Sequence, residues 1–270
     1  TKSKHGTTPF ESVKDAISYA RRYRRNKTTE IWVAQGTYYE YNILVPAGVQ
    51  LYGGFSGTET IRGERTNPWV YPTIIDAGRR GRCFEALHKT VIDGFVIQNG
   101  RDWNSGDGKG AAILTYDADV KIRHNLIRKN VDSWAGAIFI EGFDRRRKVA
   151  NASPLIEYNV LIDNFSNYCA AAIELRGSAA TIRNNTIIGN KGFGLEIQDL
   201  LGPYQEIVYG NFYNNIITDN VRQKENDVWA EARKSTNYSY VGKCWNLEGK
   251  YKPYDYGEGN IFGDVSAAKP

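Results

Sequence analysis

The sequence predicts an all-β chain whose short strands wind into a stack of coils. Four copies of one frame support this, at 122–130, 156–164, 182–190 and 212–220: an apolar residue, an Asn three positions later, an apolar residue two positions after that, and a second Asn five positions after the first. The first Asn residues of the frames lie 34, 26 and 30 residues apart, and repeats of that length are typical of stacked units. Val, Ile and Thr dominate the frames and Gly or Asn separate them, which favours strands joined by turns over helix pairs.

The chain is predicted to form one domain. Its 270 residues, 41% hydrophobic and 24% charged, suffice for one large or two ordinary domains. No Pro-, Gly- or Ser-rich linker interrupts it, and one frame runs directly into the next. We therefore expect a single elongated domain over 1–270, with a cap helix at 8–26, coils at 29–220, and a last coil, a long loop and a C-terminal cap at 221–270.

Charge and hydropathy exclude several classes of partner. The formal net charge is +5, but Lys and Arg are scattered among Asp and Glu apart from the run 145–148. A nucleic-acid interface needs a basic stripe with interleaved aromatic residues, so we expect no nucleic-acid partner and assign the run to a solvated loop. No stretch of 18 apolar residues occurs, so no membrane span is expected. The chain starts without a signal peptide or an initiator Met, as an excised module does, and we expect a monomer.

The cysteines and histidines give no cofactor signature. Cys83, Cys169 and Cys244 are too few for a disulfide framework, and their spacing does not choose which pair closes. The three histidines are dispersed, which argues against zinc. No Asp/Glu cluster has an obvious Ca²⁺-binding spacing, so neither Ca²⁺ nor another cofactor is indicated.

A capping signal marks the first element. Residues 8–11, Thr-Pro-Phe-Glu, combine a Thr at the N-cap, Pro at the first helical position and Glu at the third, and this is a capping box. Apolar residues then recur at helical spacing on one stripe. We expect this amphipathic helix to cover the open end of the first coil. The stripe consists of Val13, Ala16, Ile17 and Ala20.

Short apolar segments separated by Gly or Pro-Ala-Gly turns follow the helix. They lie at 30–34, 36–39, 42–45 and 49–55 and fit the strands of one coil. A polar insertion at 56–72 precedes the next strand, 73–76. Residues 91–100 form a degenerate copy of the repeated frame, with Phe95 at the position of the first Asn.

These features together resemble the right-handed parallel β-helix of the pectin-lyase-like superfamily. The resemblance is carried by the capped helix, by 31–38, by Leu-Tyr-Gly-Gly-Phe at 51–55, by 92–97 and by the four Asn frames, and it covers most of residues 8–220. It implies a right-handed parallel β-helix with three-strand coils, an N-terminal capping helix and an irregular, aromatic-rich C-terminal cap. It also implies a secreted or cell-surface protein. The superfamily hosts lyases, hydrolases, epimerases, phage tailspikes, adhesins and carbohydrate-binding modules, so the fold does not choose the function.

Stacking places equivalent residues of successive coils above one another, about 4.8 Å apart. The second apolar position of the frame is therefore expected to form a buried aliphatic column, and the first Asn a ladder of side-chain amides that both donate and accept. An outward column alternates in charge and is interpreted as an exterior salt-bridge ladder. The aliphatic column is Ile97, Ile127, Leu161, Ile187 and Ile217; the Asn ladder is Asn125, Asn159, Asn185 and Asn215; the charged column is Asp93, Arg123, Glu157 and Arg183, followed by Tyr213.

A second frame, at 112–116, 137–141, 172–176, 194–198 and 227–231, carries the candidate site. Strand alternation directs Ile113, Ile138, Ile173 and Leu195 inward. It directs two columns outward: Leu114, Phe139, Glu174, Glu196 and Trp229, and beside them Tyr116, Glu141, Arg176, Gln198 and Glu231.

An aromatic residue precedes each of the first four of these strands. Sugar C–H faces stack on aromatic rings, and sugar hydroxyls bond to charged groups. The leading hypothesis is therefore a carbohydrate-binding module that holds a polysaccharide, of plant-cell-wall type, along this face, as part of a larger multimodular enzyme. The aromatic residues are Trp103, Trp134, Tyr168 and Phe193. The competing interpretation is that each ring only covers the edge of its own turn.

Two other functions stay open at this point. A polysaccharide lyase or glycoside hydrolase can be built from Glu141, Glu174, Arg176 and Glu196: Glu174 and Glu196 lie one coil apart, and mutual repulsion can raise one pKa and supply a general acid. Lyases of this fold use an Arg or Lys base with Ca²⁺, but no family catalytic motif matches residue by residue. The third hypothesis is an adhesin or surface-structural repeat.

Overall fold

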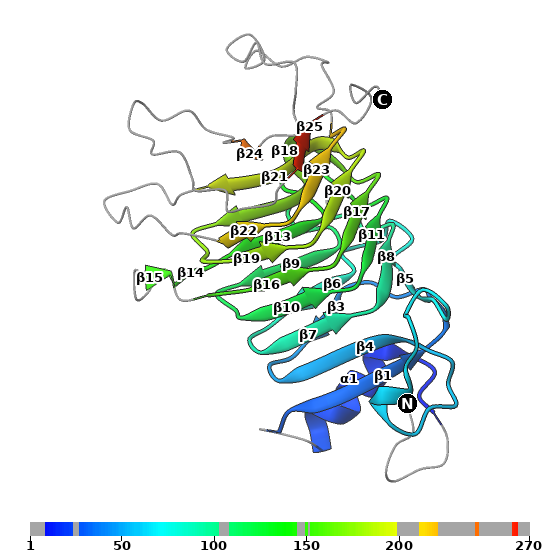
Figure 1. Ribbon diagram of the computed structural model, residues 1–270. Helices are drawn as coiled ribbons and strands as arrows, with labels where there is room; N and C mark the ends of the chain where they lie inside the picture. Colours follow the sequence, from blue (N-terminus) through cyan, green and yellow to red (C-terminus); the bar gives the residue numbers. More distant parts are fainter. Residues whose placement is uncertain are drawn as a thin grey trace.

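A computed structural model shows a stack of coils with a helix at its N-terminal end (Figure 1). It describes residues 9–23, 27–102, 108–144, 149–150, 152–198, 211–220, 241–242 and 261–263. The irregular, aromatic-rich C-terminal cap expected after residue 220 lies outside the described residues, apart from two short strands.

Three parallel sheets run the length of the stack, and each coil contributes one strand to each sheet. Sheet 1 consists of β1 (Thr29–Ala34), β4 (Val49–Phe55), β7 (Thr90–Asp93), β10 (Val120–Arg123), β16 (Leu155–Glu157), β19 (Thr181–Arg183) and β22 (Asn211–Tyr213). Sheet 2 consists of β2 (Gly36–Tyr38), β5 (Thr73–Asp76), β8 (Phe95–Gln98), β11 (Leu126–Arg128), β17 (Val160–Ile162), β20 (Thr186–Ile188), β23 (Ile216–Thr218) and β25 (Ile261–Gly263). Sheet 3 consists of β3 (Ile43–Val45), β6 (Phe84–Ala86), β9 (Ile113–Tyr116), β13 (Ile138–Glu141), β18 (Phe165–Arg176), β21 (Lys191–Gln198) and β24 (Val241–Gly242). This confirms the predicted parallel β-helix with three-strand coils.

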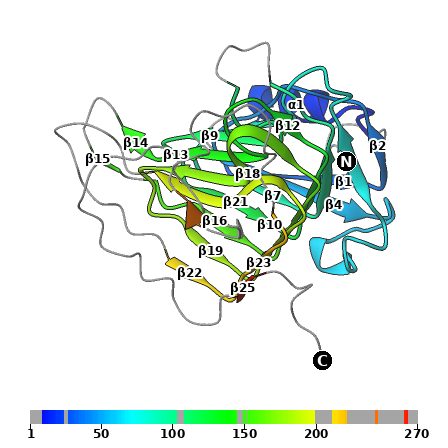
Figure 2. The same ribbon diagram turned by 90° about the horizontal axis from the view of Figure 1, so that it is seen from above.

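The remaining elements are short. A single 3₁₀ turn, η1 (Arg62–Glu64), lies in the insertion after β4, and β12 (Val131–Asp132) pairs with the first part of β18. An antiparallel ribbon of β14 (Phe143–Asp144) and β15 (Val149–Ala150) projects from one side of the stack, as both ribbon views show (Figures 1 and 2). The basic run 145–148 that joins its strands lies outside the described residues.

The capping helix begins later than predicted. Helix α1 spans Val13–Tyr23 and buries the predicted stripe. Residues 9–12 of the predicted range 8–26 precede the helix, and residues 8 and 24–26 lie outside the described residues. Ser12 is the N-cap, since its hydroxyl accepts a hydrogen bond from Asp15 N at 3.1 Å. The Glu40 carboxylate, from the turn after β2, accepts hydrogen bonds from Val13 N at 2.7 Å and Lys14 N at 3.0 Å. A carboxylate from the first coil thus satisfies the free N–H groups and the positive end of the helix dipole, and this contact between segments fixes where the helix starts.

We expect Glu40→Ala to lower the free energy of unfolding by about 1 kcal/mol, because two helix N–H groups lose their acceptor. Urea unfolding followed by circular dichroism measures the change. The matched control is Glu11→Ala: Glu11 is exposed and lies before the helix, so its loss should leave the midpoint unchanged. A larger effect at Glu11 than at Glu40 would contradict capping by Glu40 and support the capping box predicted at residues 8–11.

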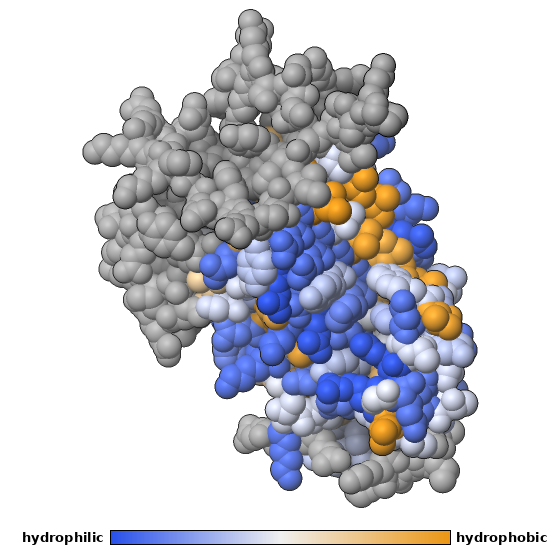
Figure 3. Space-filling view, in the orientation of Figure 1, coloured by the Kyte–Doolittle hydropathy of each residue, from blue (hydrophilic) through white to orange (hydrophobic). Residues whose placement is uncertain are grey.

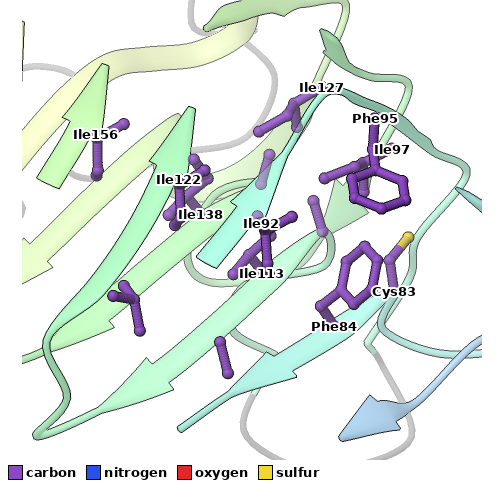
Figure 4. Close-up of a cluster of buried hydrophobic side chains, with 14 of the residues drawn as sticks. Cys83, Phe84, Ile92, Phe95, Ile97, Ile113, Ile122, Ile127, Ile138 and Ile156 are labelled. Carbon is purple, nitrogen blue, oxygen red and sulfur yellow. The ribbon is translucent and has the colours of Figure 1, made fainter. Parts of the chain in front are cut away.

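The interior is filled by aliphatic columns, one from each sheet. Ile127 of β11 pairs with Ile97 and Leu161, and Ile187 with Leu161 and Ile217. All five are at most 1% exposed, which confirms the predicted column. Figure 4 shows isoleucines of sheets 1, 2 and 3 gathered in the interior of the coils, with Phe84 and Phe95 beside them. Cys83, also in this cluster, is a free and buried thiol whose pKa is raised by burial.

Two asparagine ladders hold the corners of the coils. In the predicted ladder the Asn159 amide donates to Ile122 O at 2.9 Å and to Asn185 Oδ1 at 3.0 Å, while its Oδ1 accepts from Asn125 N at 3.1 Å. Phe95 N donates to Asn125 Oδ1, so Phe95 occupies the Asn position as predicted. The second Asn of each frame forms a parallel ladder of the same kind, Asn130, Asn164, Asn190 and Asn220. The residue before every Asn of the two ladders has a positive φ, which makes each corner a tight bend.

The outward face of sheet 1 carries the charged column. Arg123 Nε donates to Asp93 Oδ2 at 2.6 Å, and Arg183 bonds to Glu157 at 2.7 Å and to the Tyr213 hydroxyl at 2.8 Å. This confirms the predicted salt-bridge ladder, which appears as a hydrophilic area beside a hydrophobic strip in Figure 3. Asp93 is more buried than expected, at 1% exposed, because Arg65 from the insertion also covers it. Hydrogen bonds and the charges of Arg65 and Arg123 hold the pKa of Asp93 below its usual range despite burial.

Candidate functional site

The register of the predicted binding face is confirmed. On sheet 3, Phe139 pairs with Leu114 and Glu174, and Glu174 with Glu196. In the second column, Glu141 pairs with Tyr116 and Arg176, and Arg176 with Gln198. The first column also continues toward the N-terminus through Glu85 and Leu44.

Much of this outward face is covered, contrary to expectation. Leu114 and Phe139 form a hydrophobic cluster of their own with Ala135, separate from the interior of the coil, and Trp134 packs against it. Their side chains therefore point outward as predicted, but the turns fold back over them. A Cβ added to Gly110 would lie 3.1 Å from Phe139 Cβ, and Lys109 Nζ lies 5.0 Å from the Phe139 ring centroid, so this turn packs against Phe139.

Burial corrects the set of ligand-contacting residues. A ligand on the surface does not reach residues without exposed area, and this applies to much of the C-terminal half of the face. Leu114 is 2% exposed, Phe139, Glu174 and Glu196 0%, Glu141 6% and Phe193 3%. The alternation in each strand predicted the direction of these side chains correctly, but it contained no information on the turns above them.

Three predicted residues keep surface area. Tyr116 is 42% exposed and lies edge-on to Phe139, with ring centroids 6.2 Å apart. Trp134 and Arg176 are half-buried. Trp103 and Trp229 lie outside the described residues, as do the side chains of Tyr168 and Gln198. The strand predicted at 227–231, with Glu231, is also outside them. On the side of β21 away from β18, the described strand that pairs with it is β24.

Positive groups flank the buried ring at the centre of the face. The Arg176 guanidinium lies 5.1 Å from the Phe139 ring centroid, and Lys109 Nζ lies 5.0 Å from it. Arg176 also donates to Glu174 Oε1 from Nε at 2.8 Å and approaches the same oxygen with Nη2 at 2.7 Å. Arg176 is therefore held in place by its neighbours on the face.

Two buried carboxyl groups lie side by side beyond Arg176. Ligating atoms of Glu174, Glu196 and Cys169 all lie within 4.8 Å of one another. Burial raises the pKa of Glu174 to about 7, with Arg176 and Lys109 acting in the opposite direction. Cys169 is disulfide-bonded and offers no thiolate, so this cluster does not match the donor set of a zinc site. Cys83 is a free thiol, and Cys244 lies outside the described residues.

A second buried acidic cluster was missed by the sequence analysis. Arg82, 7% exposed, forms an ion pair with Asp102, and its Nε donates to Gly110 O at 3.1 Å. Arg82 therefore anchors the turn that covers Phe139. Asp132 follows Val131, which pairs with Arg101, and burial raises the pKa of Asp132 to about 8. No repeated pattern marks these residues, so the sequence offered no signal for them.

The accessible part of the sheet 3 face lies at its N-terminal end. A cavity of about 350 Å³ is lined by Asn42, Leu44, Arg80, Gly81, Arg82, Glu85, Arg101 and Asp102. Leu44 is 44% exposed there, on the same outward column as Leu114 and Phe139. Arg80 donates to Tyr39 O at 3.1 Å and lies 4.7 Å from the Tyr41 ring centroid. The lining of this cavity combines the apolar side chain of Leu44, three guanidinium groups and two carboxyl groups.

The comparisons give a family but no function. Within the described residues, no helix is long and apolar enough to cross a membrane. Comparison with curated proteins and with solved structures found no match. One family model matches residues 1–246, and its description reads "Protein of unknown function (DUF1565)". The match spans most of the sequence, and the chain therefore belongs to the DUF1565 family.

Proposed function

We propose that this protein binds a polysaccharide on the outward face of sheet 3, at the N-terminal coils, in the manner of the carbohydrate-binding modules of the pectin-lyase-like superfamily. The observation that carries the proposal is the cavity around Leu44. Its volume falls within the range of small-ligand sites, about 300–1,000 Å³. Exposed Tyr116 lies on β9, one strand beyond β6, and adds an aromatic surface on the same face.

The chemistry of the cavity fits a sugar. Leu44, in the lining of the cavity, can contact the apolar C–H face of a pyranose ring. Arg80 and Arg101 can donate to hydroxyl oxygens, and Glu85 can accept from hydroxyl groups. The ligand is therefore placed closer to the N-terminus than the sequence suggested, over β3, β6 and β9. The buried Phe139, Glu174 and Glu196 are not contacts in this proposal.

Affinity electrophoresis of the full chain through gels that contain soluble polysaccharides tests the proposal. We expect retardation by at least one polysaccharide without release of product. Arg80→Ala and Glu85→Ala should each weaken the retardation about tenfold, because each removes a charge-assisted hydrogen bond to the ligand. The matched control is Arg21→Ala, an exposed Arg on α1 that does not line the cavity, which should leave retardation unchanged.

Other outcomes separate the alternatives. Absence of retardation with every polysaccharide contradicts binding and favours a surface-structural role. Loss of retardation in Trp134→Ala but not in Glu85→Ala contradicts the placement at the N-terminal coils and moves the ligand toward the middle of sheet 3. If Arg80→Ala, Glu85→Ala and Trp134→Ala are all retarded as strongly as wild type, the ligand lies neither at the N-terminal coils nor at the middle of sheet 3.

Polysaccharide hydrolysis is the second candidate. One observation favours it: Glu174 and Glu196 lie within 4.8 Å, and the pKa of Glu174, at about 7, suits a general acid. Both carboxyl groups are 0% exposed, which opposes it, because a substrate must reach them. New reducing ends in the retarded fraction, lost in Glu174→Gln, would establish hydrolysis and replace the binding proposal.

A further inference from the structure

Glu174 and Glu196 are two buried carboxyl groups that the proposed binding site does not use. They lie on β18 and β21, which pair in register at these residues. Both side chains are 0% exposed, and their carboxyl oxygens lie within 4.8 Å of one another. Two negative charges at that separation, out of water, repel strongly.

The contacts of Glu174 show where a proton is needed. Its Oε1 is bonded to Arg176, but its Oε2 is buried without a hydrogen-bond partner. A buried carboxylate oxygen without a donor is costly. Since Glu196 is the neighbouring carboxyl group, a proton carried between the two supplies that donor.

The charges around the pair do not remove the need for a proton. The groups that face Glu174 are Arg176 on β18, Lys109 in the covering turn, and Glu141 on β13. Burial is the largest effect on Glu174 and raises its pKa to about 7, although Arg176 and Lys109 act to lower it. Glu174 therefore holds a proton near neutral pH.

We propose that Glu174 and Glu196 share one proton at neutral pH, in a carboxyl–carboxylate hydrogen bond that joins β18 to β21. The carboxyl O–H of one residue donates to a carboxylate oxygen of the other, and no other bond is made or broken. Loss of this proton above neutral pH leaves two buried negative charges on adjacent strands. Their repulsion weakens the pairing of β18 with β21, under the covered part of the sheet 3 face.

The pair makes stability depend on pH with a defined sign. Below about pH 4.5 both the folded and the unfolded chains hold the proton. Between about 4.5 and 7 the folded chain keeps it while the unfolded chain releases it, so the contribution of the pair to stability falls as pH rises. Above the folded pKa both states are ionised and the loss is complete.

Infrared difference spectroscopy at pH 6 on the full chain tests the proposal. The C=O stretch of a protonated carboxyl group should appear in wild type minus Glu196→Gln. The side-chain amide introduced by that substitution donates an N–H to Glu174 Oε2, so Glu174 no longer needs the proton. The difference spectrum of wild type minus Glu174→Gln should show the same band. Asp132 is protonated in wild type and in both variants, so its own C=O band cancels in both difference spectra. The control Glu85→Gln, at a half-buried carboxyl group, should show no band.

The outcome that overturns sharing is specific. If burial alone protonates Glu174, the Glu196→Gln variant itself still has the carboxyl C=O band. The difference spectrum of wild type minus Glu196→Gln then shows no such band. The dependence of the urea midpoint on pH between 5 and 7 then stays as steep in Glu196→Gln as in wild type. A shallower dependence in Glu196→Gln, with circular dichroism like that of wild type, supports the shared proton. Neither result depends on polysaccharide binding, so this test and the electrophoresis fail independently.

Discussion

Asn159→Ala is expected to lower the free energy of unfolding by about 3 kcal/mol or more. Asn159 is 1% exposed, and its side chain serves the coil on either side. Its removal leaves Ile122 O without the amide donor at 2.9 Å and Asn125 N without the acceptor at 3.1 Å. Each buried polar group left without a partner costs about 1–3 kcal/mol. Since the stability of a typical domain is about 5–15 kcal/mol, this one amide carries a large share.

Urea unfolding monitored by tryptophan fluorescence measures this loss. The matched control is Asn167→Ala, an exposed Asn on β18, for which a change within about 0.5 kcal/mol is expected. Equal effects at Asn159 and Asn167 would show that the ladder contributes no more than any surface amide. A variant that unfolds during expression, with Asn167→Ala normal, agrees with the expected loss.

Ile217→Ala should lower the free energy of unfolding by about 3 kcal/mol, because a buried Ile truncated to Ala loses its transfer free energy and leaves a cavity. Ile217 is 1% exposed and pairs with Ile187 on one side and Phe262 on the other. Its neighbour Ile216, on the same strand, is 39% exposed and points outward. The same substitution at Ile216 should cost less than about 1 kcal/mol.

This pair of variants tests the register directly. A strand shifted by one residue sends every inward side chain outward. If the register were wrong by one residue, Ile216→Ala would therefore be the more destabilising of the two substitutions. Equal losses at Ile216 and Ile217 would mean that both faces of β23 are packed. The two chains differ by the position of one Ile only, so helix and strand propensities cancel in the comparison.

The direction of a side chain was predictable from the repeated frames, whereas its accessibility was not. The frames predicted which side chains point inward and which outward, as Ile97 to Ile217 and the Asp93–Arg123 pair confirm. They also predicted that Glu174 and Glu196 stand on adjacent strands. The prediction failed at the start of the helix, since Glu40, from a segment 27 residues away, caps Val13.

The sequence by itself determined the repeat, and with it the register of three sheets. Strand alternation and coil stacking are local and periodic, so equal positions in each frame meet equal positions in the next. Only the tertiary structure decided which outward residues stay accessible. The turns differ in length from coil to coil: the one held by Arg82 lies over Phe139, while the cavity around Leu44 stays open. Burial by a turn depends on where its path crosses the sheet, and that path is set by contacts between coils, which no repeated pattern records.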